Sequence, residues 1–106
     1  MSSASPSTNA VAARSLSRKL LHRFLSLQPD WARPALASAL SIPESRLSEY
    51  EWGQRLMPLD VQGRLAAFVL AHEPALCQLA NRLRLQVEAA RRYEAGDVVR
   101  HLTYPR

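Results

Sequence analysis

The segment SIPESRLSEYEWGQR, residues 41–55, carries the start and the body of a short polar helix. Ser41 and Glu44 have the S-x-x-E spacing of a capping box, in which the two side chains bond free backbone N–H groups at a helix start. Pro43 lies in the first turn, where its missing N–H removes no hydrogen bond. These signals predict a helix at residues 43–51 that is too polar to be buried on every side.

Leu47 and Tyr50 give this helix a narrow apolar edge, because residues three apart share one face of a helix. Gly53 follows the last turn and suits the left-handed conformation that ends many helices. Charged and serine side chains fill most other positions. The helix is therefore predicted to pack through Leu47 and Tyr50 and to expose the rest of its surface.

Four other segments have apolar residues at helical spacing, and none shows the strict alternation of a strand. The predicted helices are residues 15–27, 31–40, 59–71 and 74–94. Asp30 is the candidate N-cap of the second, which could also start later with Pro34 in its first turn, and Gly96 is the expected end of the last. The predicted inner faces are Leu16, Leu20, Phe24 and Leu27; Leu36, Ala37 and Leu40; and Val61, Leu65, Phe68 and Val69. The fold class is all-α.

The chain has 106 residues, the length of one domain with one modest core. It carries 14 Lys+Arg against 9 Asp+Glu, a net charge of +5, and all but one of these cations are arginine. Arginine presents a planar fork that pairs well with phosphate, so a nucleic-acid partner is one explanation of this composition. The other explanation is a soluble protein that is simply rich in arginine.

Several classes of protein are excluded by the residues that the chain lacks. Cys77 is the only cysteine, which excludes an internal disulfide and a zinc site built from cysteines. His22, His72 and His101 lack the spacing of metal ligands, and we see no nucleophile–His–acid set or glycine-rich phosphate loop. We expect no enzyme activity, metal or cofactor. Apolar runs fall short of the roughly 20 residues of a membrane span and no secretory signal is visible, so we expect a cytoplasmic protein.

The connection between the helices predicted at residues 31–40 and 43–51 is very short. Two short helices joined this tightly must cross steeply, so the second projects its outer face into solvent. The side chains on that outer face are Glu44, Ser45, Arg46, Ser48 and Glu49. A short projecting helix of this kind matches the major groove of B-DNA, which is about 12 Å wide.

The stretch LASALSIPESRLSEYEWGQRLMP, residues 36–58, resembles the helix-turn-helix of the lambda-repressor/Cro-like, or XRE, family. The family pattern is L-A, then L-G-[VI], then [IL]-S-x-[YWI]-E-x-G, then a proline. The matching positions are Leu36, Ala37, Leu40, Ile42, Leu47, Ser48, Tyr50, Glu51, Gly53 and Pro58. With the neighbouring helices, the resemblance covers about residues 15–71.

The resemblance implies a five-helix lambda-repressor-like helix-turn-helix domain with a long C-terminal helix. We place this DNA-binding domain at residues 13–72 and the C-terminal helix and tail at residues 73–106. The small polar residues at the N-terminus predict a flexible tail at residues 1–12. The implied function is a sequence-specific transcriptional regulator, acting as a repressor, that binds double-stranded DNA.

The resemblance also assigns contacts to single positions. Those that would reach base edges, or lie beside such positions, are Glu44, Ser45, Glu49, Arg46 and Ser48. Those that would contact phosphates are Arg33, Gln54 and Arg55. Glu51 would pair with an arginine of the first helix, for which Arg23 is the candidate. Trp52 is expected to pack over the edge of the core, with contact to the DNA backbone as the alternative.

The sequence departs from the family pattern at five positions. Pro43 replaces the usual Ser or Thr at the start of the recognition helix. Ser41 replaces the usual Gly in the turn, and Arg33 replaces the usual Gln. Glu44 and Glu49 place negative charge where DNA would be approached, and a carboxylate there can accept from cytosine N4 or repel phosphate.

The helix predicted at residues 74–94 carries an apolar stripe with close to heptad spacing. The members of the stripe are Leu76, Leu79, Ala80, Leu83, Val87 and Ala90. One interpretation is a helix laid across the first four helices. The other, which we favour, is the seam of a homodimer through Leu76, Leu79, Leu83 and Val87, because regulators of this type bind two half-sites.

A second function class stays open at this point. The chain could keep the helix-turn-helix fold but use the helices at residues 43–51 and 74–94 to hold another protein, as an antitoxin or an accessory regulator would. The acidic residues of the projecting face favour this alternative. The arginine-rich composition and the match to the motif favour DNA binding.

Overall fold

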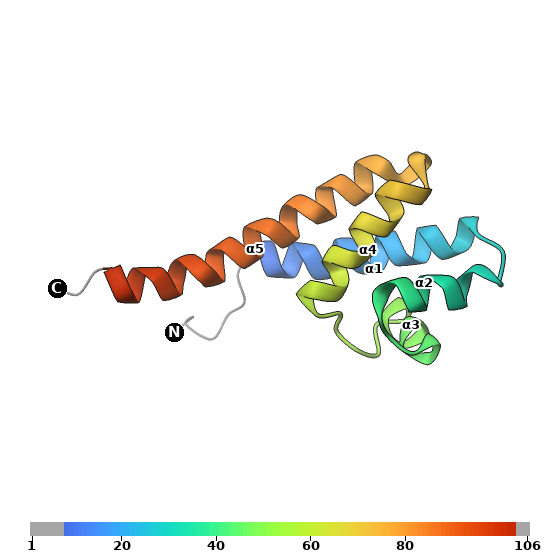
Figure 1. The fold of residues 1–106 in the computed structure, drawn as a ribbon, viewed down its shortest axis with the longest axis horizontal. Coiled ribbons are helices and arrows are strands. Elements are labelled where there is room, and N and C mark those ends of the chain that lie inside the picture. Colours follow the sequence, from blue (N-terminus) through green and yellow to red (C-terminus); the bar gives the residue numbers. More distant parts are fainter. Residues whose placement is uncertain (1–7, 104–106) are drawn as a thin grey trace.

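The computed structural model describes residues 8–103, with side chains from Val11 to Arg92. Its elements are α1 Thr8–Leu27, α2 Ala32–Leu40, α3 Glu44–Glu51, α4 Leu59–His72, the short 3-10 helix η2 Pro74–Leu76, and α5 Cys77–Thr103 (Figure 1). All secondary structure within residues 8–103 is helical, which confirms the all-α class. No helix in this range is long and apolar enough to cross a membrane.

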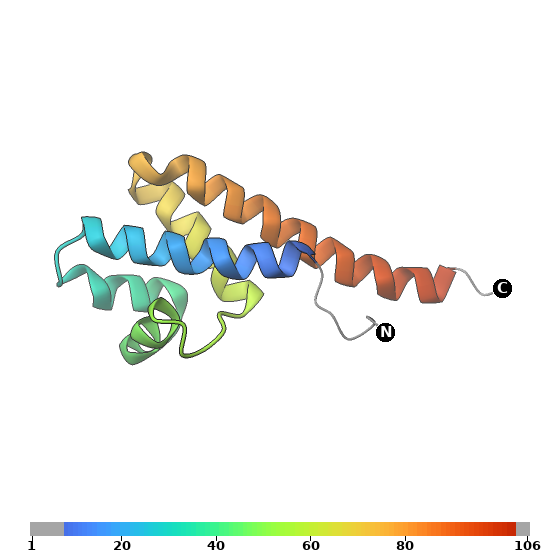
Figure 2. The same cartoon turned by 180° about the vertical axis from the view of Figure 1, so that it is seen from behind.

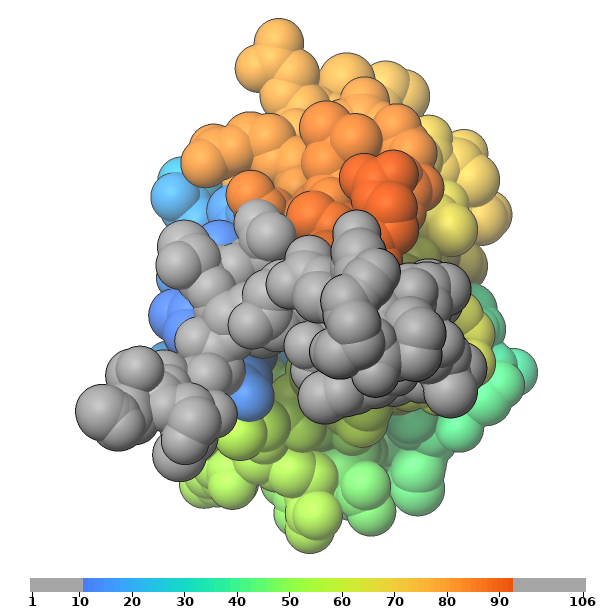
Figure 3. Space-filling model, turned by 90° about the vertical axis from the view of Figure 1, so that its left-hand side faces the viewer, coloured from blue at the N-terminus to red at the C-terminus, as the bar shows by residue number. Residues whose placement is uncertain are grey.

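Three long helices form the body of the molecule. α4 and α5 pack against each other as a hairpin closed by η2, and α1 runs alongside both of them. Figures 1 and 2 show α1 and α5 side by side from opposite views. α2 and α3 form a compact pair that packs on α1 and α4, on the side of the molecule away from α5 (Figure 3).

A continuous apolar core lies between these helices, as the helical spacing predicts. The largest fully buried apolar side chains are Leu20, Leu21, Leu36, Leu40, Leu47, Leu65, Leu83 and Val69. The rings of Phe24 and Phe68 meet edge to face at 5.7 Å, which joins α1 to α4. Leu27 was placed on the inner face of the first helix, and this is wrong. It is 56% exposed, because α1 ends there and the chain turns away from the body.

Two helix boundaries differ from the sequence-based expectation by more than three residues. α1 begins at Thr8 instead of Ser15, so residues 8–12 of the predicted tail are helical, while residues 1–7 lie outside the described residues. The extension is anchored by Ala13, which is fully buried in the core. α5 continues past Gly96 to Thr103. A single glycine lowers helix stability by only about 1 kcal/mol and does not by itself end a helix.

The predicted dimer seam lies inside one protomer. Leu76, Leu83 and Val87 are buried in the core, and Leu79 is partly buried against it. The stripe therefore packs α5 onto α1 and α4, as in the interpretation that we did not favour. Leu76, Leu83 and Val87 cannot form the surface of a homodimer while the protomer stays folded, and Leu79 already packs against the core of its own protomer, so the predicted seam is wrong.

Candidate nucleic-acid interface

The connection from α2 to α3 is a Schellman turn, and Ser41 is its left-handed residue. The backbone N–H of Ser41 donates to the carbonyl of Ser38 at 3.0 Å, and the N–H of Ile42 donates to Ala37, also at 3.0 Å. Ser41 has φ 60° and ψ 43°. Its position is the one where the XRE pattern has glycine, so the backbone conformation that glycine favours is present although the residue is serine.

The predicted caps at the starts of α2 and α3 are not formed. The residue before α3 is Pro43, in an extended conformation, and no side chain caps this helix. Ser41 ends α2 instead of starting α3, which removes the capping box with Glu44. Trp31 precedes α2 without a side-chain cap, and Asp30 contributes only its carbonyl, which accepts from the N–H of Arg33 at 3.1 Å.

Replacing Ser41 with glycine is expected to raise the free energy of unfolding by about 0.5–1 kcal/mol, because a left-handed conformation strains any residue with a Cβ. Ser38→Gly is the matched control. Ser38 is an exposed position inside α2, so glycine there is expected to lower the free energy of unfolding by about the same amount. Urea denaturation of both variants measures the two shifts. Destabilisation by Ser41→Gly would contradict the assigned conformation.

α3 ends in a second Schellman turn, in which Gly53 takes the left-handed position with φ 75°. The N–H of Gly53 donates to the carbonyl of Tyr50 at 3.2 Å, and the N–H of Gln54 donates to Glu49 at 2.8 Å. The left-handed stop predicted at Gly53 is therefore confirmed. A Cβ at this position would lie 2.9 Å from Cζ of Arg18, so the guanidinium of α1 packs directly against the glycine.

The inner edge of α3 is the one that the sequence predicts. Leu47 is fully buried and Tyr50 is 3% exposed. The outer face carries the exposed side chains of Glu44, Ser45 and Ser48. α3 thus presents a polar surface to solvent, on the side of the molecule opposite α5 (Figure 3).

Glu49 is enclosed by two arginines. Its Oε1 lies 3.1 Å from Nε of Arg46, one turn earlier in α3, and 2.9 Å from Nε of Arg55, beyond the end of the helix. The three side chains together carry one net positive charge. The acidic residue that could repel phosphate is therefore paired within a basic cluster, and Arg46, Glu49 and Arg55 are brought together as one group.

Glu51 joins the first three helices. Its side chain is 9% exposed, with Oε2 lying 3.0 Å from Nδ1 of His22 on α1 and Oε1 lying 3.3 Å from Nη2 of Arg33 on α2. The prediction that Arg23 pairs with Glu51 is wrong. Arg23 is an exposed neighbour of His22, and His22 lies on the face of α1 that meets α3. The XRE pattern directs attention to arginines, so the histidine was missed.

Arg33 packs against α3, whereas Trp52 lies away from its predicted place over the core. Nη2 of Arg33 also donates to Oγ of Ser48 at 3.1 Å, so its guanidinium is turned toward α3. Trp52 does not pack over the core: it is 60% exposed, and its ring meets that of His22 edge to face at 6.0 Å. The loop that follows is held by Gln62, a buried side chain of α4 whose Nε2 donates to the carbonyl of Met57 at 2.7 Å.

Among the described residues, no cluster of His, Cys, Asp and Glu has the geometry to hold a metal ion. Comparisons of the chain with protein-family models, with curated protein sequences and with solved structures give no match. The features that bear on function are the geometry and charge of α2, α3 and the residues around them.

Proposed function

We propose that the protein is a sequence-specific DNA-binding transcriptional regulator of the XRE type, acting as a repressor in the cytoplasm, with α3 as its recognition helix. The observation that supports this most is the outer face of α3. It is polar, exposed and held at both ends by main-chain hydrogen bonds, so its side chains stand on a fixed backbone. A helix presented in this way can enter a major groove and read base edges.

The charge pattern around α3 supports the same proposal. Arg55 lies just beyond the helix and Arg46 lies within it, and their pairing with Glu49 leaves a net positive group next to the exposed Ser45. Arginines beside a reading surface are suited to phosphate contacts, which fix the register of a protein on a duplex. Ser45 and Glu44 are then free to meet base edges.

The experiment that tests this function is selection of bound DNA from a random pool, followed by a titration of salt on the selected site. An enriched sequence is expected, and the logarithm of the affinity should fall linearly with the logarithm of salt, by about 0.9 per phosphate contact. Failure to enrich any sequence, together with an absence of salt-dependent binding, would contradict the proposal. A protein-interaction module would then be the better description.

Changing Ser45 and Arg55 is expected to separate reading from positioning. Ser45→Ala should weaken the selected site by about 1–3 kcal/mol and leave random DNA unaffected, because only a base contact carries sequence information. Arg55→Ala should weaken both kinds of DNA and reduce the salt slope by about one contact. Gel-shift titrations at several salt concentrations measure both effects. Equal losses in the two variants would contradict the assignment.

The regulator is also proposed to act as a homodimer, since one small domain reads too few base pairs to find its site. The surface cannot be the buried stripe of α5. α5 instead continues beyond the end of the body formed with α1 and α4 (Figure 1). A short isolated helix is marginal in water, and we place the contact with a second copy at the part of α5 that runs beyond the body.

Removing residues 93–106 is therefore expected to leave a folded monomer. Among residues 11–92, whose side chains the structure describes, the buried core runs from Ala13 to Ala90, and the truncated chain keeps all of these residues. Sedimentation at micromolar concentration measures the change from dimer to monomer, and circular dichroism confirms that the truncated chain is folded. A full-length chain that sediments as a monomer would contradict the dimer itself.

A further inference from the structure

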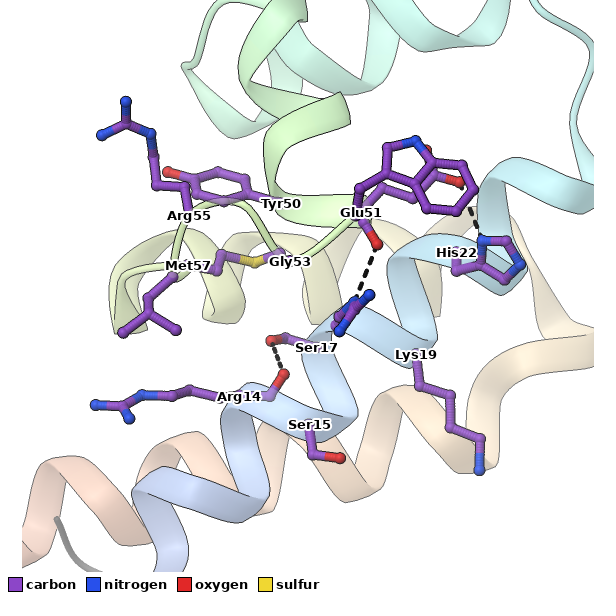
Figure 4. Close-up of a pocket in the computed structure, with 13 residues that line it drawn as sticks. Arg14, Ser15, Ser17, Lys19, His22, Tyr50, Glu51, Gly53, Arg55 and Met57 are labelled. Atoms are coloured by element: carbon purple, nitrogen blue, oxygen red, sulfur yellow. Dashed lines mark hydrogen bonds and ion pairs between the residues drawn. The ribbon is translucent and has the colours of Figure 1, made fainter.

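A basic groove separates α1 from the end of α3 and the loop that follows it. Its volume is about 570 Å³, within the range of about 300–1,000 Å³ that is usual for small-molecule sites. One wall is α1, with Arg14 and Lys19, and the other is the segment from Tyr50 to Met57 (Figure 4). Arg18 also lines the α1 wall. The base contacts proposed for Glu44 and Ser45 do not use this groove.

Within the described residues, the positive charge that Arg14 and Arg18 bring to the groove is not neutralised. The single carboxylate of the lining is Glu51, and both of its oxygens are engaged by His22 and Arg33. Within the described part of the chain, Arg14 and Arg18 have no carboxylate at ion-pair distance. They are four residues apart on α1, where like charges destabilise a helix. An anion between α1 and the α3 end would remove this repulsion.

Arg18 is held in place for such an anion. Its Nε donates to the backbone carbonyl of Glu51 at 3.1 Å, and its guanidinium packs against Gly53. A carbonyl carries no net charge, so the bond fixes the side chain without neutralising it. Because the side chain is already ordered, binding a ligand would lose little of its conformational entropy.

Two large apolar side chains border the same groove. Trp52 is 60% exposed and Leu56 is 65% exposed, and both line the groove. An exposed indole offers a flat surface on which an aromatic ring can stack. The groove therefore combines a fixed cation, a second cation one turn away, and an aromatic surface.

We propose that this groove binds a small phosphomonoester that carries a flat aromatic ring, a ligand of the mononucleotide class. The phosphate would lie between Arg14 and Arg18, and the ring would stack on Trp52. A phosphomonoester is favoured over a carboxylate because its charge of about −1.5 to −2 at neutral pH matches two uncompensated cations. The inference goes beyond DNA binding, since it requires no duplex.

The test is a fluorescence titration of the full chain carrying Trp31→Phe, which leaves Trp52 as its single tryptophan. The probes are AMP, adenosine and ribose 5-phosphate, and no DNA is present. AMP is expected to quench Trp52 and to bind about tenfold more tightly than either fragment, because only AMP uses both the cations and the indole. Absence of quenching by millimolar AMP, or equal affinity for AMP and ribose 5-phosphate, would overturn the proposal.

Charge variants separate this site from general attraction to a basic protein. Arg18→Gln and Arg14→Gln are each expected to weaken AMP binding by about tenfold, the loss of one charge-assisted hydrogen bond. Arg82→Gln, an exposed arginine of α5 outside the groove, should leave it unchanged. Arg14 makes no side-chain bond to the described residues, so its variant should fold even if Arg18→Gln does not. Equal AMP affinity in Arg14→Gln and Arg82→Gln would overturn the proposal.

This result stands apart from the proposed function. If the chain binds AMP but no DNA, the proposed ligand site stands and the proposed regulatory function fails. If it binds DNA but not AMP, the proposed function stands and the proposed ligand site fails.

Discussion

Replacing Leu83 with glutamate is expected to unfold the protein, and not to divide a dimer into folded monomers. Leu83 is fully buried where α5 packs on α1 and α4. Removing a buried leucine side chain lowers the free energy of unfolding by about 2–5 kcal/mol, and placing an unpaired carboxylate in the core lowers it further. The sum approaches the whole stability of a small domain, which is about 5–15 kcal/mol.

Leu85→Glu is the matched control for this substitution. Leu85 lies two residues further along α5 and is 53% exposed, so glutamate there is expected to change the free energy of unfolding by no more than about 0.5 kcal/mol. Thermal melts followed by circular dichroism compare the two variants. A Leu83→Glu chain that melts like the wild type and sediments as a monomer would restore the intermolecular seam.

Replacing Glu51 with alanine is expected to lower the free energy of unfolding by about 2–4 kcal/mol, because its carboxylate accepts charge-assisted bonds from two helices. His22 and Arg33 both lose their partner in this variant, so α3 loses a link to α1 and a link to α2. Urea denaturation measures the loss, and a double-mutant cycle with His22→Ala isolates the bond between α1 and α3.

Glu49→Ala serves as its control. Glu49 also pairs with two positively charged side chains, but all three are substantially exposed, with 36% of the Glu49 side chain accessible. Surface ion pairs are worth about 0–1 kcal/mol, so this change should have a small effect on stability. Arg23→Ala should likewise be neutral, because Arg23 does not contact Glu51. A loss for Arg23→Ala that matches the loss for Glu51→Ala would restore Arg23 as the partner.

Local pattern was sufficient to predict the five helices and the orientation of α3. Leu47, Tyr50 and Gly53 are close in sequence, and the spacing of a helix alone determines which way they point. The buried faces of α2 and α4 follow from the same periodicity. These features depend on interactions within about one helical turn, so they can be predicted from one sequence without knowing how distant segments pack.

Most of the errors concern residues whose roles depend on a distant partner. His22 could be assigned to Glu51 only once α1 and α3 were packed together. Ser41 satisfies the spacing of a capping box at the start of α3. Because the connection between the two helices is so short, Ser41 instead ends α2. The stripe through Leu83 has the same spacing whether its partner is α1 or a second copy, and periodicity cannot distinguish the two.

The two Schellman turns also make α3 a unit whose exposed side chains can be exchanged without moving its backbone. Main-chain hydrogen bonds hold its ends, while Leu47 and Tyr50 hold its inner edge. Within the described residues, the side chains of Glu44, Ser45 and Gln54 form no hydrogen bond or ion pair that fixes this geometry. A library randomised at these three positions would vary the chemistry of the outer face on an unchanged backbone, so binding specificity could be redesigned without redesigning the fold.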